Sequence, residues 1–147
     1  MKVKVKVPAT SANLGPGFDV AGLALTLYNT FTFELNEGGL NITGCPTQFC
    51  NEENLTYQAF SQAAQSCGLD FKGVNIHCES QVPYTRGLGS SSTCIVAGIV
   101  GAFAFKDKTD DRQEILELAT KIEGHPDNVA PAIFGGLTVS VMEEEQV

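Results

Sequence analysis

The longest apolar run in the chain extends from Cys94 to Phe105 and contains 12 residues. A helix that crosses a bilayer needs about 20 such residues, so the run predicts no membrane segment. It predicts instead a buried helix that ends near Lys106, and the stretch directly before it is rich in glycine and serine. The fold must therefore place this helix inside a core, with its first turn next to a loop of small residues.

The rest of the chain alternates between strand and helix patterns. Lys2–Val7 alternates basic and apolar residues, as a half-buried strand does, and Pro8 is expected to end it. Asn54–Cys67, closed by Gly68, has the apolar spacing of a helix. Further strands are predicted at Leu25–Leu35, Leu40–Thr43, Gly73–Glu79 and Leu137–Met142, and further helices at Asp111–Ile122 and Val129–Phe134. Because strands and helices interleave irregularly, the predicted fold class is α+β.

Length, charge and cysteine usage narrow the class of partner. A chain of 147 residues has the size of one domain. Its 17 acidic and 9 basic residues give a formal net charge of −8, whereas surfaces that bind nucleic acid or anionic membranes are normally basic. We expect neither partner, and a phosphate group would be bound locally, by backbone N–H groups and a metal ion. The five cysteines form no CxxC pair, and with no signal peptide they predict reduced thiols and a cytoplasmic location.

The first segment that carries chemistry is the Gly/Ser-rich stretch Pro83–Thr93. Glycines let the backbone approach a phosphate closely, and the N-terminus of the following helix presents unpaired N–H groups. Serine hydroxyls there can donate to phosphate oxygens or bind magnesium. The stretch lacks the Gly-Lys-Ser/Thr of a Walker A loop, and Ser92 replaces the third glycine of the dinucleotide fingerprint. A flexible loop that caps a buried helix is the alternative, and this segment alone does not decide between them.

The second segment, Pro8–Asp19, places Asn13 and Asp19 in a tight loop after the first predicted strand. Gly15 and Gly17 permit unusual backbone angles in that loop. Loops that leave a strand often carry binding groups. Asn and Asp are also ordinary turn residues, and for this segment read alone the turn is the favoured interpretation.

The third segment, Glu123–Ala132, places His125, Asp127 and Asn128 in one turn. A histidine and a carboxylate this close can orient a hydroxyl or take its proton. The alternative is a helix-breaking turn whose Asp or Asn caps the next helix. Glu117, in the preceding predicted helix, either belongs to the same site or has a structural role, because it can form an ion pair with the lysine four residues further on.

Taken together, and in their order along the chain, the three segments resemble the GHMP superfamily of small-molecule kinases, and most closely its homoserine kinase branch. The stretches that carry the resemblance are PATSANLGPGFD, GLGSSS and EGHPDNVAPA, which begin at Pro8, Gly87 and Glu123. The resemblance implies a GHMP-kinase N-terminal domain, with a mixed or antiparallel sheet and helices packed on it. It also implies transfer of the γ-phosphoryl group of ATP, with Mg²⁺, to the side-chain hydroxyl of L-homoserine, a step toward threonine. A homodimer is compatible with it.

The resemblance further implies roles for individual residues. Asn54 would border the adenine, and the phosphate loop would consist of Pro83, Arg86, Gly87, Leu88, Gly89, Ser90, Ser91, Ser92 and Thr93. Ser91 and Glu117 would bind magnesium, and Asn13, Asp19, His125 and Asn128 would face the amino acid, with His125, Asn128 and Glu117 as the catalytic set. Asn128 stands where branches such as mevalonate kinases carry an aspartate. His125 and Asn128 would therefore orient the hydroxyl rather than fully deprotonate it.

The chain is about half as long as a usual member of the superfamily, so we expect residues 1–147 to be an N-terminal, ATP-binding domain without its C-terminal partner. The second glycine-rich motif of the family has no counterpart here, and Arg86 and Arg112 do not match its substrate-binding arginines. Tyr84, beside Arg86, also departs from the smaller lead-in of many members. Three alternatives stay open: a truncated domain that binds nucleotide without catalysis, a kinase for another small alcohol such as mevalonate, and an RNA-binding domain, which the acidic charge disfavours.

Overall fold

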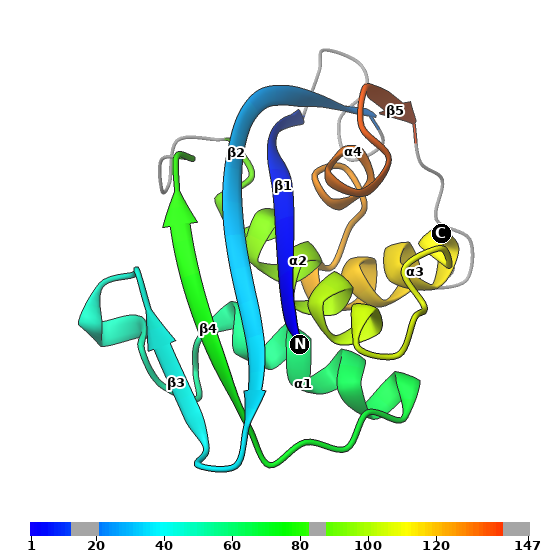
Figure 1. Cartoon of the computed structure of the whole chain (residues 1–147). Coiled ribbons are helices and arrows are strands. Elements are labelled where there is room, and N and C mark those ends of the chain that lie inside the picture. Colours follow the sequence, from blue (N-terminus) through cyan, green and yellow to red (C-terminus); the bar gives the residue numbers. More distant parts are fainter. Residues whose placement is uncertain (13–20, 83–87, 140–147) are drawn as a thin grey trace.

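The computed structural model describes residues 1–12, 21–82 and 88–139. Figure 1 shows one twisted sheet with the helices gathered on one side of it. In chain order the elements are β1 (Lys2–Ala12), β2 (Ala21–Asn36), β3 (Leu40–Thr43), the short 3₁₀ helix η2 (Thr47–Phe49), α1 (Leu55–Cys67), β4 (Gly73–Ser80), α2 (Ser90–Ala104), α3 (Arg112–Glu123), α4 (Val129–Phe134) and β5 (Leu137–Val139). The predicted α+β class is confirmed.

The sheet is mixed, as the resemblance implied. Its strands lie in the order β1-β2-β4-β3, and β5 pairs with β2 outside that path. β2 is antiparallel to β1, β4 and β5, whereas β3 runs parallel to β4. β2 is therefore the central strand, and β1, β4 and β5 are all positioned by their pairing with it.

The prediction that Pro8 ends the first strand was wrong. β1 continues to Ala12, and its register with β2 shifts between Pro8, which pairs with Tyr28, and Thr10, which pairs with Ala24. Proline donates no backbone hydrogen bond, so a local irregularity accommodates it without ending the strand. β2 takes up the extra residues and curves strongly at this end in Figure 1.

α2 is the buried helix predicted from the apolar run, and it begins at Ser90 instead of near Cys94. It packs against β1 and β2 and against the other helices. On its α1 side the core contains an aromatic group in which Phe33 stacks on Phe60 with ring centroids 5.4 Å apart. Neither α2 nor any other helix in the described ranges combines the length and apolarity that a bilayer crossing requires.

The ends of α1 and α3 agree closely with the predicted boundaries. The Asn54 Oδ1 atom accepts the Tyr57 N–H at 3.1 Å and so caps α1, which ends at Gly68 in a left-handed conformation. Asp111 caps α3 in the same way, and α3 ends at Gly124. Asn and Asp at the first end of a helix and Gly at the last are common capping residues in proteins, so the local sequence was sufficient to predict these helix ends. Of the strand predicted at 137–142, the described part is β5.

Candidate active site

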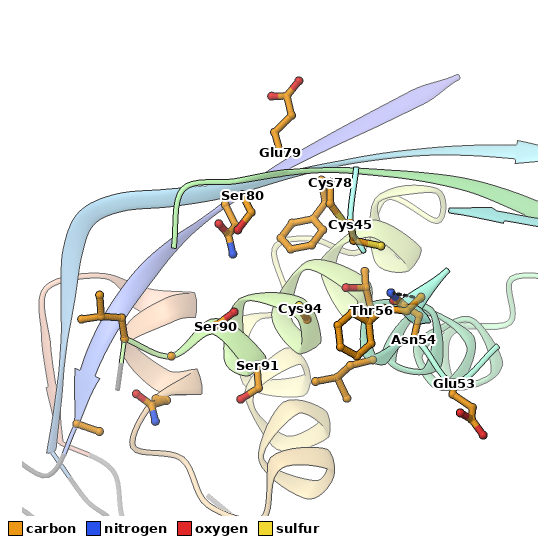
Figure 2. Close-up of a pocket in the computed structure, with 18 residues that line it drawn as sticks. Cys45, Glu53, Asn54, Thr56, Cys78, Glu79, Ser80, Ser90, Ser91 and Cys94 are labelled. Atoms are coloured by element: carbon orange, nitrogen blue, oxygen red, sulfur yellow. Dashed lines mark hydrogen bonds between the residues drawn. The ribbon is translucent and has the colours of Figure 1, made fainter. Parts of the chain in front are cut away.

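A cavity of about 580 Å³ opens between the sheet and the N-terminal ends of α1 and α2 (Figure 2). Its lining comes from four places, namely Asn29, Phe31, Cys78, Glu79 and Ser80 on the sheet; Cys45, Phe49, Glu53, Asn54, Leu55 and Thr56 before and at the start of α1; Leu88, Gly89, Ser90, Ser91 and Cys94 at the start of α2; and Ala12 with Asn128. In Figure 2, Cys45, Cys78 and Thr56 lie toward one end, and Ser90 lies toward the other. An apolar end and a polar end suit a ligand that has both characters.

The polar end is formed by the N-terminus of α2. Gly89 precedes the helix with φ of 69°, a left-handed conformation, and a Cβ atom there would lie 2.2 Å from Thr10 Oγ1. Glycine is thus required at this position for both backbone angle and space. Among the described residues no side chain caps this end of α2, and the Thr93 N–H, which donates to Gly89 O, begins the helical ladder. The preceding amides of the first turn are available to an anion, which the helix dipole also favours.

Thr10 connects the end of β1 to both sides of the cavity. Its backbone N–H donates to Leu88 O at 3.0 Å, and its buried hydroxyl donates to Asn128 Oδ1 at 2.8 Å. The Asn128 amide therefore sits near the α2 N-terminus with its oxygen held and its Nδ2 donors left for other partners. In the described residues the Asn128 side chain makes no cap on α4, so the capping interpretation does not explain it.

Asn29 joins the residues that follow β4 to the first turn of α2. Its Oδ1 atom accepts the backbone N–H groups of Gln81 and Val82, each at 2.9 Å, and its Nδ2 atom donates to Thr93 Oγ1 at 2.9 Å. Asn29 is buried, and Thr93 in turn donates to Ser90 O at 2.6 Å. One amide on β2 thus fixes both the residues that enter the loop and the first turn of α2. The sequence alone does not reveal this role of Asn29, because its hydrogen-bond partners are more than 50 positions away along the chain.

Glu123, the last residue of α3, brings a carboxylate to Ser91. Burial raises the pKa of Glu123, and the nearby Asp127 carboxylate adds to the rise, whereas His125 and a hydrogen bond with the Ser91 side chain oppose it. The Glu123 carboxylate is half-buried. A hydroxyl and a half-buried carboxylate in contact form a small oxygen donor set beside the α2 N-terminus.

The structure does not bring Glu117 to Ser91. Glu117 is exposed on α3, where its Oε1 atom accepts from Gln113 Nε2 at 3.1 Å. Glu117 and Glu123 are six residues apart, which is a rotation of about 240° around a helix, so they point in different directions. Among the described residues Glu117 forms no ion pair with Lys121. The position of Glu123 at the end of α3, directly before Gly124, is the sequence signal that could have identified Glu123 as the carboxylate near Ser91.

The turn after α3 contains a histidine–carboxylate pair. His125 Nδ1 and Asp127 Oδ1 are hydrogen-bonded, and Asp127, which is 2 % exposed, also accepts the Asn128 N–H at 3.0 Å. Gly22 on β2 packs against this turn so closely that a Cβ atom would lie 2.0 Å from Asp127 O. The pair fixes the orientation of the His125 ring near Glu123 and Asn128.

The remaining predicted site residues fall into three groups. Asn13, Asp19, Pro83, Arg86 and Gly87 lie outside the described residues. Leu88, Gly89, Ser90, Ser91 and Asn54 line the cavity, and Asn54 also donates to Phe49 O at 3.0 Å. Ser92 and Thr93 are buried and do not line the cavity, so their side chains face the core.

Fold and site together define a domain of the small-molecule kinase type. The chain belongs to the GHMP kinases: the model of the GHMP kinases N-terminal domain matches residues 54–136, more than half of the sequence. Within the family it is similar to homoserine kinases. It is 51 % identical over 145 residues to the homoserine kinase of Clostridium beijerinckii, with 98 % of this chain and 49 % of the relative covered.

Solved structures agree with this placement. A Listeria monocytogenes protein assigned as a homoserine kinase superposes with a TM-score of 0.86 and 35 % identity, over 99 % of this chain and 52 % of that one. The homoserine kinase of Cytophaga hutchinsonii superposes with a TM-score of 0.79 and 29 % identity, over 94 % and 48 % of the two chains. The chain thus spans about half the length of the relatives that it matches.

Proposed function

We propose that this chain supplies the nucleotide site and part of the acceptor site of a kinase that phosphorylates the side-chain hydroxyl of L-homoserine with ATP. The observation that carries the proposal is the uncapped N-terminus of α2, which opens onto the cavity within contact of Thr10 and Asn128. A helix N-terminus binds phosphate, and the same cavity extends to an apolar end that accommodates a flat base. The similarity to homoserine kinases supports the choice of acceptor.

The phosphates would be held mainly by backbone amides. Leu88, Gly89, Ser90 and Ser91 face the cavity, so their N–H groups and the two serine hydroxyls are the donors that we assign to the triphosphate. Thr93 contributes indirectly, because its hydroxyl receives the Asn29 hydrogen bond that positions the loop. At the other end, Asn54 and Phe49 would border the base.

Magnesium fits the pair formed by Ser91 and Glu123. Mg²⁺ prefers oxygen ligands, keeps several waters and usually takes one or two carboxylates together with substrate phosphates. A hydroxyl and one half-buried carboxylate beside the phosphate-binding helix match that preference, whereas the exposed Glu117 does not. We therefore propose Glu123 in the role that the sequence suggested for Glu117. The ion would neutralise phosphate charge during transfer.

The acceptor hydroxyl would be oriented by His125 and Asn128. Asp127 holds the His125 ring and Thr10 holds the Asn128 amide, so both side chains are positioned before substrate binds. Asn128 is not a base, and a loose phosphoryl-transfer transition state needs little deprotonation of the acceptor. Catalysis would then rest on positioning and charge neutralisation. Asn13 and Asp19 stay predictions as contacts of the amino acid.

A coupled ADP-release assay tests the function, with L-homoserine, mevalonate and no acceptor as its three arms. It should compare this chain with a polypeptide that continues to the full length of the relatives. We expect homoserine-dependent ADP release from the longer polypeptide. Turnover with mevalonate and not with homoserine would overturn the proposed acceptor.

A second candidate is a domain that binds nucleotide without transferring phosphate. The coverage of only half of each relative favours it for the 147-residue chain taken alone. Saturable binding of ATP without ADP release in any arm would support this candidate for that chain. A homodimer and a cytoplasmic location stay predictions, which analytical ultracentrifugation and cell fractionation would test.

A further inference from the structure

Four of the five cysteines gather around the cavity. Cys45, Cys78 and Cys94 line it, and Cys50 contacts Cys45, whereas Cys67, the last residue of α1, is buried in the core. Figure 2 shows Cys45 and Cys78 toward the same end of the cavity. Burial raises the pKa of Cys78 to about 12 and also raises that of Cys94, so both thiols are protonated at neutral pH.

Cys45 and Cys50 differ from Cys78 and Cys94 because they contact each other. Their Sγ atoms are 3.4 Å apart, and both residues are partly exposed. The short helix η2 between them turns the chain so that residues five positions apart meet. In the described part of the chain this is the one hydrogen-bond contact between two sulfur atoms, and Cys50 Sγ also donates to the carbonyl oxygens of Cys45 and Pro46.

The pair is connected to the nucleotide end of the cavity. Phe49 lies directly before Cys50 and lines the cavity, with 47 % of its surface exposed. The Phe49 carbonyl accepts the Asn54 Nδ2 hydrogen bond at 3.0 Å, and Asn54 caps α1 and lines the cavity itself. We expect a movement of Cys50 toward Cys45 to shift the Phe49 carbonyl, which is bonded to Cys50, and so to disturb its hydrogen bond with Asn54.

We propose that Cys45 and Cys50 form a reversible disulfide with small-molecule disulfides as oxidant, and that its formation weakens nucleotide binding in the cavity. The second part rests on the proposed function, since it assumes that the cavity binds ATP. The first part depends only on the two thiols.

The chemistry is thiol–disulfide exchange in two steps. The Cys50 thiolate attacks one sulfur of a small disulfide RSSR, forms a mixed disulfide and releases one RS⁻. The Cys45 thiolate then attacks Cys50 Sγ and releases the second RS⁻, and the two protons lost by the protein thiols go to the two leaving thiolates. Two protein thiols are thus oxidised while one RSSR is reduced to two RSH. Burial raises the pKa of Cys45 to about 11, which assigns it to the intramolecular second step, where proximity compensates for its low thiolate fraction.

Linkage makes the effect reciprocal. If the disulfide weakens ATP binding by a given factor, saturating ATP must disfavour the disulfide by the same factor at equilibrium. The redox equilibrium can therefore be measured with and without ATP as an independent check on the change in affinity.

Mass spectrometry after incubation with glutathione disulfide tests the first part. Cleavage after Glu37 and Glu52 releases residues 38–52, which contain Cys45 and Cys50 without any other cysteine. We expect this peptide to lose the mass of two hydrogens, to resist alkylation and to recover with dithiothreitol. Cys50→Ser should abolish the change, and Cys67→Ala, which removes a remote thiol, should leave it intact. A peptide that stays alkylatable, or a disulfide to Cys78 or Cys94, would overturn the proposal.

Binding of a fluorescent ATP analogue to the same samples tests the second part. We expect oxidation to raise its Kd at least fivefold, with dithiothreitol restoring the original value and Cys50→Ser showing no change. An equal Kd in both redox states would refute the coupling to the cavity. If the disulfide forms and neither state binds the analogue, the proposed nucleotide site fails while the disulfide stands.

Discussion

The Thr10 hydroxyl donates to Asn128 Oδ1 at 2.8 Å although 118 positions separate the two residues. Thr10 is fully buried, and the hydrogen bond fixes the orientation of the Asn128 amide, because its oxygen must face Thr10. The contact thus joins the end of the first strand to the turn that we assign to the acceptor.

Thr10→Val removes this hydroxyl while keeping the shape of the side chain. We expect a loss of about 1 kcal/mol in the free energy of unfolding, since one buried hydrogen bond disappears. In the active polypeptide kcat should fall about tenfold, because Asn128 loses the contact that orients it. Urea unfolding and the ADP-release assay measure the two effects, and Thr10→Ser should retain both properties. An unchanged kcat in Thr10→Val would show that Asn128 is oriented by other contacts.

Asn29→Ala removes three hydrogen bonds from the ends of the phosphate loop. Since each contributes about 1 kcal/mol, we expect a loss of about 3 kcal/mol in stability and an increase in the KM for ATP. Asn75→Ala is the matched control, because it removes the 2.8 Å hydrogen bond with Asn36 on the sheet, away from the cavity. The control should lose about 1 kcal/mol and keep its KM for ATP. Equal KM values in the two variants would contradict the role of Asn29.

Glu123→Gln and Glu117→Gln separate the two candidate magnesium ligands on α3. We expect Glu123→Gln to lower kcat/KM by about 10²-fold or more and to raise the magnesium concentration needed for half-maximal activity, because a charged ligand is lost. Glu117→Gln should change neither quantity, since Glu117 is exposed and contacts Gln113. The reverse result would restore the residue that sequence alone suggested.

The raised pKa of Glu123 also predicts a pH dependence of stability. Between about pH 4.5, where the unfolded chain titrates, and the higher pKa of the folded state, the native protein binds more protons than the unfolded one. The contribution of Glu123 to the free energy of unfolding therefore falls as pH rises through this window. Glu123→Gln removes that contribution, so the difference in stability between the variant and the parent should increase with pH there. Urea titrations at several pH values measure it, and a constant difference would contradict the assigned pKa.

Local patterns were sufficient for much of this fold. The boundaries of α1 follow from Asn54 and Gly68, which are cap residues, and the position of α2 follows from its apolar run beside the Gly/Ser-rich loop. Both signals depend on residues within one or two turns of each other. The resemblance singled out Leu88–Ser91 and Asn128, which line the cavity. It could do so because each of its three segments is a contiguous stretch of sequence.

The errors and omissions concern relationships that local sequence does not contain. Pro8 was expected to end β1, but its irregularity is absorbed by extra residues in β2, which only pairing reveals. Glu117 and Glu123 have the same chemistry, and the direction of each side chain depends on where α3 lies against α2. Asn29 meets Thr93 across 64 positions, so neither residue signals the other.

β2 pairs with both β4 and β5 along one edge, because β1 pairs along its other edge. β4 pairs with Asn29–Asn36 and β5 with Ala21–Leu23, which leaves 24–28 between them. The end of β4 leads to Gln81 and Val82, whose N–H groups donate to Asn29 on β2, and the turn with Asn128 precedes β5. The length of this interval, at most about 20 Å along the strand, therefore sets the distance between the end of β4 and the start of β5. Inserting two residues within 24–28 would lengthen this interval of β2 by about 7 Å while preserving which side chains face inward.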